Sequence, residues 1–166
     1  MHFNLKSIST DGVPKALEKA ERYRLLNEPS LAESIYLDIL AILPSHQEAL
    51  IALLLARTDQ FDHGVTLESA QEVLRRIEGE YQRAYYSGII WERKGHSHLR
   101  QGGPSSNANA YHALHEAMKH YERAETLRAP GNDDAILRWN ACARVLMHKP
   151  EIRPLADTEF QPITGE

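Results

Sequence analysis

The segment His-Glu-Ala-Met-Lys-His at positions 115–120 is one residue longer than the HExxH motif of zinc metalloproteases. That motif binds zinc because two histidines four residues apart share one face of a helix. His115 and His120 are five positions apart, so on a straight helix they point about 140° away from each other. The segment therefore predicts no two-histidine metal site, and its histidines need another explanation.

Histidines of two neighbouring segments offer a different metal arrangement. Two antiparallel helices that turn at Gly102 and Gly103 would bring histidines of both helices together near that turn. The candidate ligands of such a zinc or nickel site are His96, His98, His112 and His115. A metal site also needs partners that orient each imidazole ring, and a histidine-rich surface tract alone is weak evidence for one. A wet, polar end of the hairpin is therefore the preferred interpretation, with no cofactor, and the metal site stays an alternative.

Motifs for enzymatic chemistry are missing from the sequence, which has no glycine-rich phosphate loop, nucleophile elbow or dinucleotide fingerprint. Cys142 is the only cysteine and lies in the apolar stretch WNACARVL, which is typical of a small buried residue. A single cysteine also excludes an intrachain disulfide and a cysteine-based zinc cluster. We expect a non-enzymatic protein.

The composition narrows the class of protein and of partner. The chain has 166 residues, of which 42% are hydrophobic and 25% charged, as in an ordinary soluble globular domain. A net charge of −4 disfavours binding to nucleic acid and to acidic membranes. The sequence shows no signal peptide and no run long enough to span a bilayer. We therefore expect a cytoplasmic protein with neither a nucleic-acid nor a membrane partner.

Helical periodicity, interrupted by turn residues, runs along most of the chain and predicts an all-α fold. The predicted helices cover residues 13–28, 31–43, 47–58, 67–79, 81–101, 107–129 and 133–148. Pro14 suits a first helical turn, and Asp133 or Asn132 is expected to cap the last helix. The predicted parts are an N-terminal segment 1–12, a helical repeat domain 13–147 and an extended or disordered tail 148–166.

One spacing of residues recurs in the second helix of each predicted hairpin. It places an alanine four residues before a larger side chain, in the pairs Ala32 and Tyr36, Ala70 and Leu74, and Ala117 and Tyr121. In two first helices a small residue stands three before an aromatic one, in the pairs Ala20 and Tyr23, and Gly88 and Trp91. A small residue lets two helices approach closely, and the large one fills the space beside the crossing. Because Ala117 and Tyr121 face the core, we expect His115 and His120 to lie at the edges of the buried stripe or in solvent.

This arrangement resembles the tetratricopeptide repeat, which pairs small and aromatic residues in both helices and ends on a proline. Tyr23, Ala32, Tyr36 and Pro44 match that pattern, and Ala20, Leu54 and Gly88 lie 34 residues apart, which is the repeat length of the family. The resemblance covers roughly residues 13–147. It implies an α-solenoid of about three helical hairpins, a C-terminal capping helix and an extended tail.

In that family the first helices of the hairpins line a concave groove that receives a peptide or helix of a partner protein. The resemblance thus implies an adaptor or chaperone-like protein. Its partner-binding residues would be Leu17, Glu21, Arg24, Ile51, Leu55, Thr58, Tyr85, Tyr86, Ile89, Arg93 and Asn140. Apolar stripes also form the core between helices, so each position has packing as its alternative role. Because Tyr85 and Tyr86 are adjacent, only one is expected to face inward.

Some members of the family hold a terminal carboxylate with lysines and asparagines. Here Leu17 and Glu21 stand at the corresponding places of the first repeat, and a glutamate repels a carboxylate. The residues favour an apolar ligand, such as an amphipathic helix or an extended segment.

One candidate ligand is the chain's own tail, with Ile152, Leu155, Phe160 and Ile163. Two other functions stay open, a chaperone for secreted proteins and a metal-binding protein that uses the histidine-rich hairpin. A homodimer is also open, because the ends of a solenoid expose apolar faces unless they are capped.

Overall fold

The computed structural model describes residues 1–154. These residues form seven α-helices and two short 3-10 helices, with no β-strand among them, which confirms the all-α expectation for this part of the chain. The α-helices are α1 (Val13–Leu25), α2 (Pro29–Ile42), α3 (Gln47–Thr58), α4 (Leu67–Leu74), α5 (Glu80–Gln101), α6 (Pro104–Leu127) and α7 (Asp134–His148). The 3-10 helices are η1 (Thr10–Gly12), before α1, and η2 (Phe61–His63), between α3 and α4.

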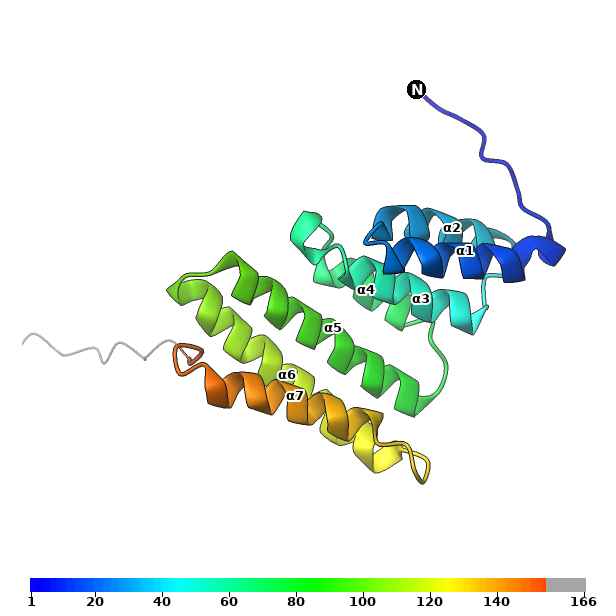
Figure 1. Ribbon diagram of the computed structural model, residues 1–166. Coiled ribbons are helices and arrows are strands. Elements are labelled where there is room, and N and C mark those ends of the chain that lie inside the picture. The colour runs from blue at the N-terminus through cyan, green and yellow to red at the C-terminus, as the bar shows by residue number, and fades with distance from the viewer. Residues whose placement is uncertain (155–166) are drawn as a thin grey trace, which may run out of the picture.

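The helices pack mainly against their neighbours in the chain (Figure 1). The longest contact joins α5 and α6, the two long helices of the third hairpin, and α7 lies along α6. Contacts beyond the nearest neighbours are few, but α1 contacts α3 and α3 contacts α5. The first helices of the three hairpins therefore meet one another in turn.

Small residues of the recurring pattern lie in the interior, as the spacing predicts. Ala32, Ala70 and Ala117 are fully buried. Tyr36 and Tyr121 are buried as well, and the ring of Tyr121 lies directly against Gly88 of α5. A methyl group on Gly88 would stand only 2.4 Å from Cε1 of Tyr121. The close approach of α5 and α6 thus depends on this glycine.

Several helix ends differ from the sequence prediction, by three residues at the end of α1, by five at the end of α4 and by three at the start of α6. Helix α4 ends at Leu74 rather than near Gly79, and Ile77, beyond its end, is buried. Helix α6 begins at Pro104 rather than at residue 107. The turn before it needs only Gly102 and Gly103, whose φ values of 73° and 89° lie in the left-handed region, and proline fits a first helical turn.

The cap of α7 combines the two residues that the sequence suggested. Asp133 is the residue before the helix, but its side chain makes no capping hydrogen bond. The side-chain oxygen of Asn132 accepts the hydrogen bond from the backbone N–H of Asp134 instead, at 3.2 Å. Asp133 therefore occupies the capping position, and Asn132 supplies the capping hydrogen bond.

The buried apolar residues form two clusters. One lies among α1 to α4 and includes Ile90 of α5, and the other lies among α5 to α7. Leu55 of α3 and Tyr86 of α5 pack against both clusters, so they join the two parts of the molecule.

The predicted extended tail begins after α7. Residues 149–154 form no helix, and Ile152 is buried within this short stretch. The other tail residues considered as ligands of the groove, Leu155, Phe160 and Ile163, lie outside the described residues.

Candidate functional site

A hollow of about 480 Å³ lies between α1 and α3 on the side of the first helices. Its lining consists of Leu17, Glu21, Arg24, Tyr36, Glu48, Ile51, Ala52 and Leu55. Five of these residues, namely Leu17, Glu21, Arg24, Ile51 and Leu55, are among those that the sequence predicts to bind a partner. The structure therefore brings five of the six predicted residues of the first two hairpins together in one place, all but Thr58.

A second hollow, of about 550 Å³, continues the first towards the start of α1. Leu17, Glu21 and Glu48 line both hollows. The second is completed by Pro14, Glu18, Arg22 and Leu25. We call the two hollows together the α1–α3 groove.

Helical spacing explains how the groove is built. Leu17, Glu21 and Arg24 lie four and three residues apart on α1, so they share one face of that helix. Ile51 and Leu55 do the same on α3 and form an apolar floor together with Leu17. Carboxylates of both helices stand beside this floor, from Glu18 and Glu21 on α1 and from Glu48 on α3. Arg22 and Arg24 line the hollows as well and pair with Glu18 and Glu21, so the groove has an apolar floor and a charged rim in which only Glu48 lacks an ion pair within residues 1–154.

Tyr36 of α2 closes the base of the groove with an unusual polar atom. The side chain is 1% exposed, and within residues 1–154 its hydroxyl makes no hydrogen bond of normal geometry. Burial, and next the nearby carboxylate of Glu21, raise the pKa of this hydroxyl to about 12. The hydroxyl therefore stays protonated at neutral pH.

An ion-pair chain crosses one end of the groove and links the three first helices. Asp59, which follows α3, accepts Arg24 of α1 at 2.9 Å through one carboxylate oxygen. It accepts Arg93 of α5 at 2.9 Å through the other oxygen. Arg24 also contacts Glu21, at 3.3 Å. Two predicted partner-binding residues, Arg24 and Arg93, therefore already have partners within the fold.

Four other predicted residues lie away from the groove surface. Thr58 and Ile89 are buried, at 3% and 2% exposure, and have no side-chain surface for a partner. Tyr85 and Tyr86 are both half-buried, with their rings packed edge to face at a centroid distance of 5.2 Å. Tyr86 packs against both clusters and Tyr85 against the second one, so the two rings are alike in being partly buried, where we expected one to face inward and the other to be available.

Asn140, the last predicted partner-binding residue, is half-buried on α7 and lines neither hollow of the groove. Conversely, the prediction missed Glu48 and Tyr36. Glu48 stands three residues before Ile51, so helical spacing alone could have identified it. No sequence pattern could have identified Tyr36 as a lining residue, because its spacing from Ala32 predicts a core residue. Tyr36 is indeed buried in the core.

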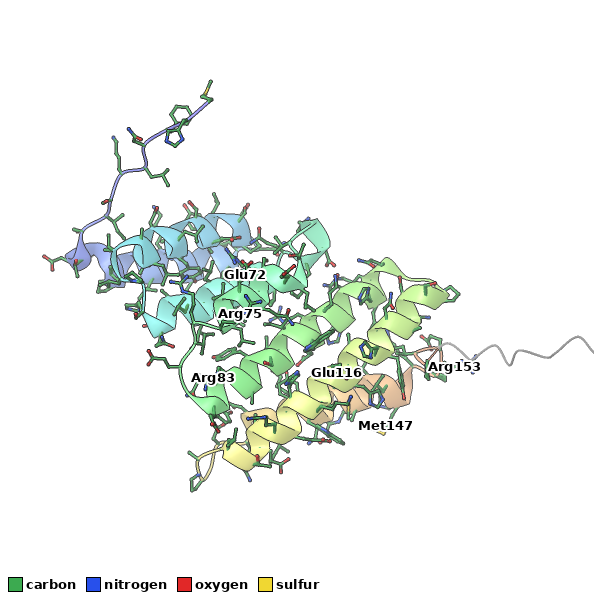
Figure 2. All side chains as sticks on the ribbon, turned by 180° about the vertical axis from the view of Figure 1, so that it is seen from behind. Glu72, Arg75, Arg83, Glu116, Met147 and Arg153 are labelled. Atoms are coloured by element: carbon green, nitrogen blue, oxygen red, sulfur yellow. The ribbon has the colours of Figure 1, made fainter. Side chains whose placement is uncertain are left out.

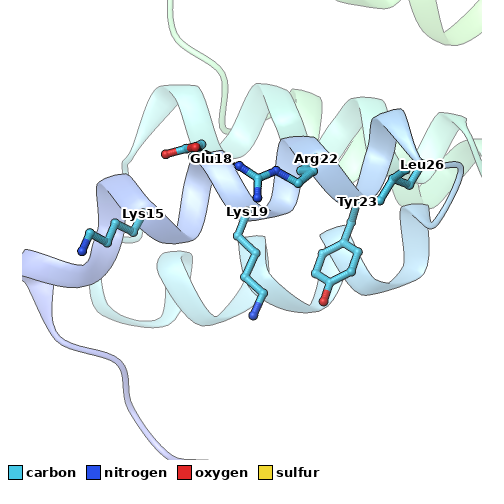
Figure 3. Close-up of a pocket in the computed structure, with 6 residues that line it drawn as sticks. All are labelled: Lys15, Glu18, Lys19, Arg22, Tyr23 and Leu26. Carbon is cyan, nitrogen blue, oxygen red and sulfur yellow. Dashed lines mark hydrogen bonds and ion pairs between the residues drawn. The ribbon is translucent and has the colours of Figure 1, made fainter.

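The outer side of α1 has the opposite character (Figure 3). A hollow of about 500 Å³ is lined there by Lys15, Glu18, Lys19, Arg22, Tyr23 and Leu26. The ammonium of Lys19 lies 6.0 Å from the centre of the Tyr23 ring. Glu18 and Arg22 line this hollow and the groove alike and form an ion pair at 3.0 Å between them. Helix α1 thus separates a basic outer side from an acidic groove.

The four histidines proposed as metal ligands have separate neighbours. His112 packs edge to face on Trp91, and His115 packs on Tyr111. His98 faces the side chain of Gln101, and His96 lies 3.9 Å from the carboxylate of Glu92. Among residues 1–154, no group of three or more histidine, cysteine, aspartate or glutamate side chains is placed to hold a metal ion. The structure does not assemble the histidine site.

Three partly buried histidines make the stability of the fold sensitive to pH. Burial lowers the pKa of His96, His98 and His120 below the ordinary value of 6.5. The unfolded chain takes up protons at these positions at higher pH than the folded chain does. Stability is therefore highest above about pH 6.5, and it falls as the pH drops through that value and through the lower folded pKa values.

Urea denaturation at about pH 7.5 and about pH 5.5 measures this difference. Replacing all three histidines by glutamine is expected to make the stability less dependent on pH. The His2→Gln variant is the matched control, because His2 is exposed and the change should leave the pH dependence as it is. An unaltered dependence in the triple variant would contradict the assignment.

Cys142 has the environment of a packing residue, as expected. It is 1% exposed within the second cluster. Burial, and next the carboxylate of Glu92, raise the pKa of its thiol to about 12. The reactive thiolate form is therefore negligible at neutral pH.

The helices of the described residues include none that is long and apolar enough to cross a membrane.

Comparisons with known proteins leave the groove to be interpreted from its own geometry. A scan of the chain against protein-family models found no matching family. Searches of the curated proteins and of the solved structures likewise found no match.

Proposed function

We propose that the chain is a protein-interaction module, adaptor or chaperone-like, which binds a peptide or helical segment of a partner protein in the α1–α3 groove. The observation that carries this proposal is the groove itself. Its floor of Leu17, Ile51 and Leu55 is apolar and unoccupied by any part of residues 1–154. The proposal includes no chemical step. It includes a cytoplasmic location, because a single buried thiol suits a reducing compartment.

The proposal includes an α-solenoid of tetratricopeptide-like hairpins. Three observations support that arrangement. Each helix packs mainly on its neighbours in the chain, the first helices contact one another in turn, and the alanines of the second helices are buried. These are the features by which stacked hairpins share a core while their first helices leave a common surface.

The rim decides which segments the groove accepts. Glu21 pairs with Arg24, whereas Glu48 makes no ion pair within residues 1–154, so an acidic segment or a terminal carboxylate is repelled on the Glu48 side of the floor. A segment with apolar side chains for the floor and a lysine or arginine for the rim is favoured. With so small a floor, we expect binding in the micromolar range.

A photo-activated crosslinking residue at position 48 tests the proposal. Glu48 is exposed on the rim, so the replacement leaves the core intact. The matched control carries the crosslinker at position 72, an exposed glutamate of α4, which does not line the groove. We expect protein adducts from position 48 that are missing at position 72.

The change Leu17→Asp in the floor is expected to reduce the adducts from position 48 by about tenfold, since a buried leucine contributes roughly 1.5–3 kcal/mol. Circular dichroism confirms that this variant is folded. Equal adducts from positions 48 and 72, or adducts from position 48 that Leu17→Asp leaves unchanged, would rule out the groove as the binding site.

A further inference from the structure

The first nine residues form an extended arm that projects from the body of the molecule (Figure 1). Residues 1–7 are all exposed, and they include two large apolar side chains, Phe3 at 74% and Leu5 at 88% exposure. The arm thus presents an apolar edge with no partner among the described residues.

The base of the arm is fixed. Ile8 packs against the first apolar cluster, and the hydroxyl of Ser9 accepts a hydrogen bond from the backbone N–H of Gly12 at 3.2 Å. These contacts set the direction in which the arm leaves η1. In both views it leaves α1 on the side away from α3, whereas the groove lies between α1 and α3 (Figures 1 and 2). The direction of the arm therefore favours the groove of another molecule over its own.

The arm and the α1–α3 groove have complementary chemistry. The arm carries the cation of Lys6 and, through residue 9, no acidic residue. Glu48 on the groove rim makes no ion pair with any side chain of residues 1–154, in contrast to Glu18 and Glu21. An apolar edge with a neighbouring cation fits an apolar floor with an unpaired carboxylate.

We propose that the arm of one copy of this chain docks in the α1–α3 groove of a second copy. Phe3 and Leu5 then pack on the floor at Leu17 and Ile51, and Lys6 pairs with Glu48. This inference rests on the proposed function, because it assigns an occupant to the same groove. A protein partner would have to displace the arm in order to bind.

The dimensions allow two copies to exchange their arms. Seven extended residues span roughly 23 Å at about 3.3 Å for each residue. The groove begins at Pro14 and Leu17, in the first turns of α1, close to the base of the arm. Two copies that meet near the starts of their α1 helices can therefore insert each arm into the other's groove. This reciprocal arrangement is a closed dimer with twofold symmetry.

A charge exchange tests the docking in the full-length chain. Sedimentation of the unaltered protein over a range of concentrations is expected to show a monomer–dimer equilibrium. The variants Lys6→Glu and Glu48→Lys each place like charges together, so each should raise the dimer Kd by about fivefold to tenfold. The double variant restores opposite charges and should return the Kd close to its original value. Lys6 and Glu48 are both exposed, so these variants keep the fold.

A second variant tests the apolar edge. Phe3→Ser combined with Leu5→Ser is expected to raise the dimer Kd by at least about tenfold. A fluorescent peptide with the sequence of residues 1–10 should bind this variant, and Leu17→Asp in the same chain should remove that binding.

A monomer at every concentration, a dimer that these substitutions leave unchanged, or a double charge variant without recovery would each overturn the docking of the arm. These results are separate from the crosslinking test of the groove. Foreign adducts at position 48 in a chain that stays monomeric would overturn the arm proposal alone. A dimer that depends on the arm, in a chain without foreign adducts, would instead overturn the binding of other proteins.

Discussion

The change Gly88→Ala is expected to destabilise the protein by about 2–3 kcal/mol, although glycine to alanine in an exposed helix stabilises a protein by roughly 1 kcal/mol. The reversed sign follows from the contact between α5 and α6. The added methyl carbon would lie 2.4 Å, 2.6 Å and 2.8 Å from three atoms of the Tyr121 ring. Tyr121 is fully buried, and its hydroxyl is held by Glu92 at 2.5 Å, so the ring has no space into which it can move.

Urea denaturation and thermal melting both measure this effect. The expected loss lowers the melting temperature by roughly 4–12 °C in a chain of this size. Ser87→Ala is the matched control, because it alters the next residue of α5, which is half-buried, and should change stability by less than about 0.5 kcal/mol. Gly95→Ala should have a smaller effect than Gly88→Ala, since the methyl there meets the aliphatic side chain of Leu114 at 2.9 Å. A Gly88→Ala variant as stable as the unaltered protein would disprove the close approach of the two helices.

The existence of this contact was only half predictable from the sequence. Helical spacing identified Ala117 and Tyr121 as core residues, and both are buried. The same reasoning paired Gly88 with Trp91 of its own helix, whereas the ring that covers Gly88 is that of Tyr121 on α6. Periodicity determines which face of a helix is buried. It does not determine which residue of the neighbouring helix lies opposite, because that depends on how far the two helices slide along each other.

In the groove, too, the sequence predicted the residues that share one helix face but not the contacts between helices. Leu17 with Glu21 and Ile51 with Leu55 each follow the i, i+4 spacing of one helix, and the sequence identified all four. The prediction that α5 continues this surface was incomplete, because Ile89 is buried. The pairing of Asp59 with Arg24 and Arg93 joins residues about 35 positions apart along the chain, so no local pattern announces it.

Glu92 is the second position at which a single substitution is expected to have a large effect. Its side chain is buried at the meeting point of α5, α6 and α7. One carboxylate oxygen accepts the hydroxyl of Tyr121 at 2.5 Å, and the other accepts the guanidinium of Arg138 at 3.2 Å. Burial acts to lower the pKa of Arg138, but the charge of Glu92 together with Tyr85 and Tyr121 outweighs it and holds that pKa above its ordinary value. One carboxylate therefore satisfies polar groups from two other helices.

We expect Glu92→Leu to destabilise the protein by about 3 kcal/mol, because the hydroxyl of Tyr121 is left buried without a partner and Arg138 loses its counter-charge. Arg138 keeps 40% of its side chain exposed, so water compensates for part of its loss and the cost stays at the lower end for a broken buried pair. Urea denaturation measures the change.

Buried ionic groups are costly to desolvate, so removing the whole group should cost less than removing one member of it. The triple variant Glu92→Leu, Tyr121→Phe and Arg138→Met leaves no unpaired polar atom at this position. We expect its stability to lie within about 1 kcal/mol of the unaltered protein, well above that of the single variant. A single variant as stable as the triple one would mean that Glu92 does not hold the three helices together. Equal, large losses in both would mean that its contribution lies in packing and not in the charge and hydrogen bonds that it supplies.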